Sequence, residues 1–206
     1  VPDAITRTLF ANDTNRTVTY SWGTWPITHD TLNGNVLGNY VAPNYLIPAG
    51  DYLTASYGIF RGFLDFSTAI LPNTIKILSA AISIYVVGIW ADVVARPWLY
   101  VTRGVQHLPP ISSDYGGQLP YTEILGQIDL GTVTLNAYND IPLNAAGLAR
   151  IDPISTTRFC LRGQNDVEDF ASVPIYKNYI WLRSRQIGIT KCPLLKINYY
   201  PAERPC

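Results

Sequence analysis

The sequence predicts an all-β fold, a jelly-roll-like sandwich of two antiparallel sheets with an extended N-terminal strand. Short β-branched and aromatic stretches recur between glycine, proline and asparagine residues, as strands do between turns. The 15 glycines and 15 prolines are spread along all 206 residues, in agreement with many turns. Long stretches with a 3.6-residue hydrophobic repeat are missing, so helices are expected to contribute little.

Two extended stretches lie in the N-terminal segment. Residues 5–10 read ITRTLF and are rich in β-branched side chains. From Thr17 to Trp22 polar and apolar residues alternate, with Val18, Tyr20 and Trp22 on one face, as in a half-buried strand. Further strands are expected at residues 52–55, 59–66, 79–87, 98–102, 131–134, 140–143, 158–161, 179–183 and 194–200.

One short helix is expected at Ala145–Ile151, where Asn144 stands at the N-cap position. No internal repeat or linker divides the part of the chain that follows residue 30. The predicted organisation is an N-terminal extended segment (residues 1–22, a candidate donor strand), a β-sandwich domain (residues 23–200) and a C-terminal tail (residues 201–206).

Charge is low and balanced. Only 15% of the residues are charged, with 15 positive and 15 negative side chains. Such a surface does not attract nucleic acid or anionic lipid, and it gives little like-charge repulsion between copies. We therefore expect neighbouring subunits, attached sugar or both to cover it.

Export is expected for this chain. Methionine is absent and the sequence starts at Val1, as in a mature chain after removal of a signal peptide. No apolar run approaches the roughly 18 to 20 residues that a membrane-spanning helix needs. The expected location is extracellular or at the cell surface, without a membrane span.

The three cysteines, Cys160, Cys192 and Cys206, lack the spacing of a metal site. In an exported protein they are disulfide candidates. A Cys160–Cys192 pair and a Cys192–Cys206 pair are equally compatible with the sequence, three unpaired thiols are the remaining alternative, and Cys206 is also placed to link subunits.

Three stretches carry a family resemblance: FRGFLDFSTAILPNTIKILSAAISIYVVG, YNDIPLNAAGLARIDPISTTRFCLRGQNDVED and CPLLKINYYP. Together, over about residues 50–201, they resemble secreted β-sandwich domains of the DNRLRE type, which are related to a family of carbohydrate-binding modules. The resemblance implies a β-sandwich and leaves function open, because such domains occur in enzymes, adhesins and structural surface proteins. The sequence departs from the family pattern at Arg150, which replaces an aromatic residue, and at Arg185, which replaces a glutamate.

Catalytic motifs are absent from the sequence, and an enzyme is not expected. The two histidines, His29 and His107, stand in loop-like contexts. Asp166 and Glu168 belong to the densest group of carboxylates, for which a solvated acidic loop is a better interpretation than a structural Ca²⁺ site. Arg162 is expected to form a structural ion pair with Asp65 or Asp166. No cofactor other than attached glycan is expected.

Carbohydrate binding is the alternative function, performed by a monomeric recognition or adhesive module that binds polysaccharide. Five tryptophans and 14 tyrosines offer rings for stacking on sugars. No pair of them has a spacing that by itself defines a binding platform.

The N-terminal segment favours a structural role instead. Asn12 and Asn15 begin two N-x-T sequons and are candidate glycosylation sites. Ile5, Leu9 and Phe10 would make a free tail prone to aggregate, so they need a partner. Either this segment folds back onto its own sandwich, or it crosses to another copy and adds a strand there, with these three side chains as inter-subunit anchors. The second alternative predicts a head-to-tail homopolymer, analogous in architecture to donor-strand fibre or pilus subunits.

Overall fold

The computed structural model describes residues 3–12, 16–21, 23–37, 46–92, 96–171, 175–185 and 188–201. Its strands are β1 (Ile5–Phe10), β2 (Arg16–Ser21), β3 (Asn35–Leu37), β4 (Leu46–Leu53), β5 (Tyr57–Ser67), β6 (Ile75–Ala91), β7 (Trp98–Arg103), β8 (Gly126–Asp129), β9 (Ala137–Pro142), β10 (Thr156–Gly163), β11 (Tyr176–Arg183) and β12 (Leu194–Pro201). The helices are α1 (Trp25–Asp30), α2 (Asp114–Gly117), α3 (Ala145–Ala149) and α4 (Gln164–Val167), with a single 3₁₀ turn at Leu130–Thr132.

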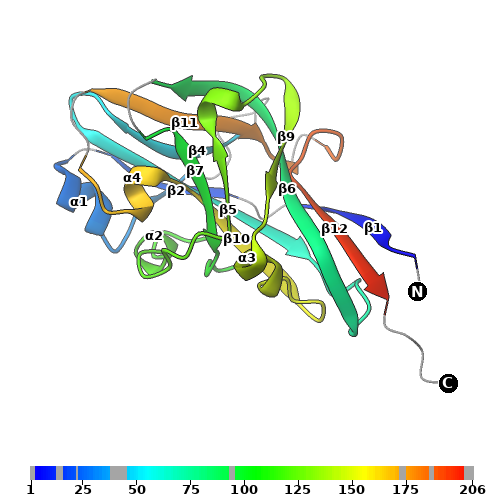
Figure 1. The fold of residues 1–206 in the computed structure, drawn as a ribbon. Helices are drawn as coiled ribbons and strands as arrows, with labels where there is room; N and C mark the ends of the chain where they lie inside the picture. Colours follow the sequence, from blue (N-terminus) through cyan, green and yellow to red (C-terminus); the bar gives the residue numbers. More distant parts are fainter. Residues whose placement is uncertain are drawn as a thin grey trace.

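The described strands form one antiparallel sheet that curls into a half-barrel (Figure 1). The main path runs β1-β12-β6-β11-β4-β5-β10-β7-β8, while β2 pairs with β5 and β3, and β9 pairs with β6. The expected all-β antiparallel class is confirmed. Hydrogen bonds link the described strands into one continuous sheet, in place of the two sheets expected from the sequence.

Long strands that change partners produce the curl. The 17-residue β6 pairs with β12 over its first half and with β11 over its second half. β5 similarly pairs with β4 near Phe60 and then with β10 from Gly62 onward. In β4, Gly50 has a positive φ of 125°, a conformation that a side chain would strain, and its Cα faces the backbone of Tyr179 closely.

The core lies inside the curl. Side chains from the β12-β6-β11 half meet those from the β5-β10-β7 half in one large apolar cluster, which includes Ile82, Ile84, Leu64, Phe66 and Phe159. A second, smaller cluster lies on the other face of β5 and β10, where α1 and α2 cover it. Its members are Val18, Trp25, Ile59, Phe63, Tyr115 and Cys160.

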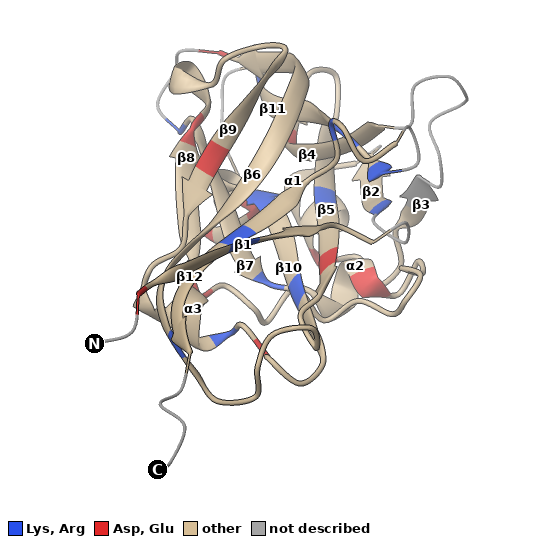
Figure 2. Cartoon of the chain, turned by 90° about the vertical axis from the view of Figure 1, so that its right-hand side faces the viewer, with Lys and Arg blue, Asp and Glu red and all other residues tan. Residues whose placement is uncertain are grey.

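The N-terminal segment lies along both halves of the curl. β1 pairs with β12 from Ile5↔Tyr199 to Phe10↔Leu194. The chain then bridges to β5 at Ala11↔Phe66 and continues as β2, which is also hydrogen-bonded to β5. In Figure 2 β1 crosses the side of the molecule that faces the viewer on its way towards β2.

Most of the expected elements are found. The stretch at residues 5–10 and the alternating stretch after it form β1 and β2, and the expected helix forms α3, where Asn144 Oδ1 accepts a hydrogen bond from the Gly147 amide at 2.9 Å. The strand expected at residues 131–134 is wrong, because Leu130–Thr132 forms a 3₁₀ turn and the strand lies just before it, as β8. α1, α2 and α4 were not expected.

Candidate functional site

The expected anchor residues of β1 fall into two groups. Leu9 is 7% exposed and belongs to the main core cluster, together with the following Ala11. Ile5 and Phe10 are each 42% exposed. β1 is the first strand of the sheet path, so no described strand pairs with its outer edge. In the single chain this segment therefore folds back onto its own sheet, with one anchor buried and two accessible.

The first sequon asparagine contacts the sheet. Asn12 is half-buried, its backbone amide donates to the Asp65 carbonyl at 3.0 Å, and its Nδ2 donates to the Asp65 carboxylate. A glycan attached to Nδ2 would take one of the two hydrogens of this donor and would need space beside Asp65. The second sequon asparagine, Asn15, lies outside the described residues.

The cysteines lie in different environments. Cys160 is fully buried in the smaller core cluster, and burial raises the pKa of its thiol strongly, so it is poorly reactive. Cys192 is buried beside the Ile189 carbonyl, 3.4 Å from Sγ. No disulfide joins Cys160 to Cys192, which removes one of the two expected pairings. Cys206, the other candidate partner, lies outside the described residues.

A buried charge network ties β5, β10 and α4 together. The Arg61 guanidinium donates to Asp166 from Nε to Oδ2 at 3.0 Å and from Nη2 to Oδ1 at 2.5 Å. Arg162 Nε donates to the same Oδ2 at 2.6 Å. All three side chains are fully buried. The expected ion pair of Arg162 is thus made with Asp166, whereas Asp65 contacts Asn12.

Two carboxyl groups in this region have opposite pKa shifts. Burial alone would raise the pKa of Asp166, but the positive charges of Arg162 and Arg61 outweigh it and hold the pKa well below its usual range. Burial raises the pKa of Asp51 to about 7, against a smaller lowering by a hydrogen bond from Asn165 Nδ2 to Oδ1 at 2.9 Å. Asp166 is therefore ionised throughout the neutral range, while Asp51 titrates within it.

This network has the contacts of a structural element. Remaining donors of the two guanidiniums reach the backbone carbonyls of Tyr115, Gln118 and Tyr121, so several loops are fastened to one carboxylate. A nucleophile or base needs access to a substrate, and these groups have none. The solvated acidic loop expected at Asp166 and Glu168 is wrong for Asp166, which is fully buried and binds two arginines. Glu168 accepts from Arg96 and Tyr100, so both carboxylates are engaged by other side chains and neither is left for the Ca²⁺ alternative.

The two histidines differ. The loop expected at His29 is wrong, because this residue lies buried in α1 with Nε2 3.0 Å from the Asp166 carbonyl. His107 is exposed as expected, with Nδ1 2.7 Å from Asp114 Oδ1. Over the described part of the chain no group of three or more histidine, cysteine, aspartate or glutamate side chains is placed to hold a metal ion.

Five aromatic rings gather on one face of four neighbouring strands, and we call them the aromatic cluster. They are Trp90 on β6, Tyr179 and Trp181 on β11, Tyr52 on β4 and Phe60 on β5. Trp90 stacks on Tyr179 with centroids 4.7 Å apart, and the other neighbouring pairs lie 5.4 to 5.9 Å apart. Trp90 is 37% exposed and the rest are half-buried. Sequence spacing gave no sign of this cluster, because strand register assembles it.

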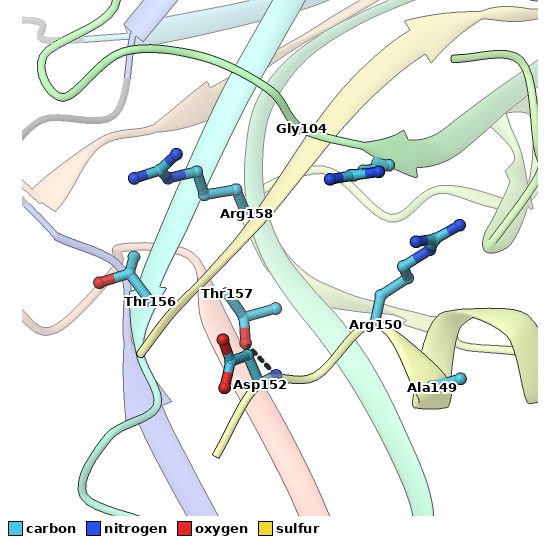
Figure 3. Close-up of a pocket in the computed structure, with 8 residues that line it drawn as sticks. Gly104, Ala149, Arg150, Asp152, Thr156, Thr157 and Arg158 are labelled. Carbon is cyan, nitrogen blue, oxygen red and sulfur yellow. Dashed lines mark hydrogen bonds between the residues drawn. The ribbon is translucent and has the colours of Figure 1, made fainter. Parts of the chain in front are cut away.

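A hollow rich in arginine lies where β7 ends and β10 begins, and we call it the arginine hollow (Figure 3). Its volume is about 270 Å³. Its polar lining consists of Arg103, Arg150, Arg158, Asp152, Thr156 and Thr157. Figure 3 shows Thr157 and Asp152 on the side of β10 that faces Arg150, and the Arg158 side chain extending from the other side of that strand. This hollow was not predicted from the sequence.

Comparison of the sequence with known protein families and with functionally characterised proteins found no match. The resemblance to DNRLRE-type domains therefore stays a prediction. None of the described helices is long and apolar enough to cross a membrane.

Proposed function

We propose that this protein is a non-enzymatic extracellular structural subunit that polymerises head to tail into a fibre or pilus-like filament, by exchange of β1 between copies. The observation that supports it best is the place of β1 at the sheet edge on β12, with Leu9 in the core. In the filament each copy's β1 would add to β12 of the next copy, which is β-strand addition. The two halves of the curled sheet would then be the layers of a jelly-roll-like sandwich, with β1 closing their open side.

Exchange would cost little free energy at the contact itself. Every copy supplies both the strand and the slot, so β1 makes the same hydrogen bonds and buries the same Leu9 in either arrangement. Beyond β1 the chain is held by the Ala11–Phe66 bridge and by the hydrogen bond from the Asn12 amide to the Asp65 carbonyl, and exchange would have to redirect the chain next to these contacts.

The surface of the segment supports an assembled state. Ile5 and Phe10 leave apolar area exposed on an edge strand, which isolated proteins usually avoid. Exchange alone leaves their exposure unchanged, so a further contact between neighbouring copies would cover them. The balanced charge of the chain also puts little repulsion between copies. Glycans at Asn12 and Asn15 and an inter-subunit bond through Cys206 belong to the same proposal.

A paired cysteine substitution tests the exchange. Thr6 on β1 and Asn198 on β12 face each other, and the Thr6 hydroxyl donates to Asn198 Oδ1 at 2.5 Å. We would combine Thr6→Cys with Asn198→Cys in a Cys206→Ser background, let the protein assemble, oxidise it and analyse it on a non-reducing gel. Exchange predicts a ladder of covalent multimers, because the two cysteines of each contact belong to different copies.

An internal cross-link, seen as a monomer of changed mobility without a ladder, would refute exchange. The single variants Thr6→Cys and Asn198→Cys are the matched controls, and each is expected to give dimers at most. Electron microscopy of the oxidised sample would show whether the cross-linked species are filaments.

Carbohydrate binding is a second candidate function, and the aromatic cluster is the observation that favours it. Aromatic faces attract the polarised C–H groups of a sugar ring, and Trp90 is accessible. Trp90→Ala is then expected to abolish retention of the protein on an insoluble polysaccharide. Phe170→Ala removes a ring that is 46% exposed outside the cluster and is the control. Equal retention of both variants and the unaltered protein would exclude the cluster as a sugar site.

A further inference from the structure

We propose that the arginine hollow binds an oxyanion, namely a phosphate or sulfate group, either free or as a substituent of a saccharide. The chain has only 15 lysines and arginines, yet three of them line this one hollow. Of the carboxylates, Asp152 lines it as well, and the buried Asp65 lies opposite Arg158 in the pairing of β5 with β10. Such a concentration of positive charge is unexpected on a surface that is otherwise sparsely charged. The inference does not depend on how copies of the chain assemble.

The three arginines come from different elements and are held by the fold. Arg103 is the last residue of β7 and lies opposite Phe159 of β10. The backbone amide of Gly104 donates a hydrogen bond to the carbonyl of Arg158, the residue before Phe159, at 3.1 Å. A Cβ atom at Gly104 would lie 2.8 Å from the Phe159 amide nitrogen, so glycine permits this close approach of β7 and β10. Arg150 directly follows α3.

The guanidiniums of Arg150 and Arg103 have weak competitors. Arg150 Nη2 pairs with Glu123 Oε2 at 2.9 Å, but both side chains are well exposed, and such surface pairs contribute roughly 0 to 1 kcal/mol. Arg103 lies 5.2 Å from the centre of the Tyr121 ring, a contact that leaves its N–H donors available for an anion. A planar guanidinium donates two parallel hydrogen bonds to phosphate or sulfate oxygens, which lysine does not do.

The floor and size of the hollow suit such a group. Thr157 is buried, and its hydroxyl accepts from the Asp152 amide at 2.9 Å, which fixes the loop that carries the carboxylate. Thr156 offers a hydroxyl at the rim. A volume of about 270 Å³ is close to the lower end of small-molecule pockets, so it admits an oxyanion together with part of the molecule that bears it.

Binding is tested by titration calorimetry of the full chain with inorganic phosphate and, separately, inorganic sulfate, with chloride at equal ionic strength as the reference. Arg158→Gln is expected to weaken binding about tenfold or more. Asp152→Asn preserves shape and removes the one carboxylate of the hollow, so it is expected to strengthen binding. Lys76→Gln removes an exposed positive charge elsewhere and is expected to change nothing.

Opposite effects of Arg158→Gln and Asp152→Asn, with unchanged Lys76→Gln, would establish the site. Absence of binding to the inorganic ions and to dextran sulfate alike in the unaltered protein, or binding equally reduced by Arg158→Gln and Lys76→Gln, would overturn it. Dextran sulfate and plain dextran distinguish the source of the oxyanion. Binding of dextran sulfate alone, lost in Arg158→Gln, assigns a saccharide substituent, whereas binding of the inorganic ions alone assigns the free ion.

Discussion

Arg61 of β5 donates two hydrogen bonds to Asp166 of α4, although the two residues are 105 positions apart in the sequence. Both side chains have no exposed surface. Removal of one partner from a buried ion pair leaves the other charge without compensation, which is more destabilising than the pair itself is stabilising. This carboxylate faces two arginines, so it is the most sensitive point of the network.

Replacement of Asp166 by asparagine is therefore expected to destabilise the protein by about 3 to 5 kcal/mol, because two buried guanidiniums lose the one carboxylate that they bind among the described residues. Urea denaturation followed by circular dichroism measures the change. Asp3→Asn, an identical substitution at an exposed position, is expected to have no measurable effect. A loss below 1 kcal/mol at position 166 would mean that the network does not hold the loops together.

Asp51 makes stability depend on pH in the opposite sense to a salt-bridged carboxylate. Its pKa is about 7 in the folded protein and 3.8 for the free group, so between these values the folded state holds one more proton than the unfolded state. Stability from this group is complete below pH 4 and is lost as pH rises to 7 and beyond. The loss is on the order of 4 kcal/mol.

The comparison of Asp51→Asn with the unaltered protein isolates this effect, since other titrating groups cancel. We expect the variant to gain stability relative to the unaltered protein between pH 4 and pH 8. Denaturation curves at a series of pH values give the difference directly. If the difference stays constant over this range, Asp51 is ionised in the folded state like an ordinary aspartate.

The sequence was informative where structure follows from local pattern. The alternation of Val18 and Tyr20 predicts β2, and Asn144 before a short helical stretch predicts the start of α3. The prediction of a strand at residues 131–134 was wrong, and the reason is also local. Asp129 Oδ1 accepts from the Gly131 amide at 2.8 Å and turns the chain there.

The candidate sites could not be predicted from the sequence, because they depend on the register between strands that are distant along the chain. Trp90 and Tyr179 stack across β6 and β11, and nothing in their spacing of 89 positions indicates this. The arginine hollow likewise lies between the last residue of β7, the first residues of β10 and the residue that follows α3. The partner of β1 was left open for the same reason, since a strand pairing between the two ends of a chain leaves no local trace.

The two adjacent glycines of α2 give a test of close packing with an internal control. A Cβ atom built on Gly116 would lie 2.6 Å from both the Cα and the carbonyl oxygen of Leu32, which are backbone atoms and yield little. At Gly117 the same atom would meet nothing within 4 Å. Gly116→Ala is therefore expected to cost roughly 1 to 3 kcal/mol, as overpacking does. Gly117→Ala is expected to be neutral or to stabilise by up to about 1 kcal/mol, because alanine restricts the unfolded chain. Thermal unfolding of the two variants side by side measures both effects, and equal melting temperatures would show that α2 does not pack against Leu32.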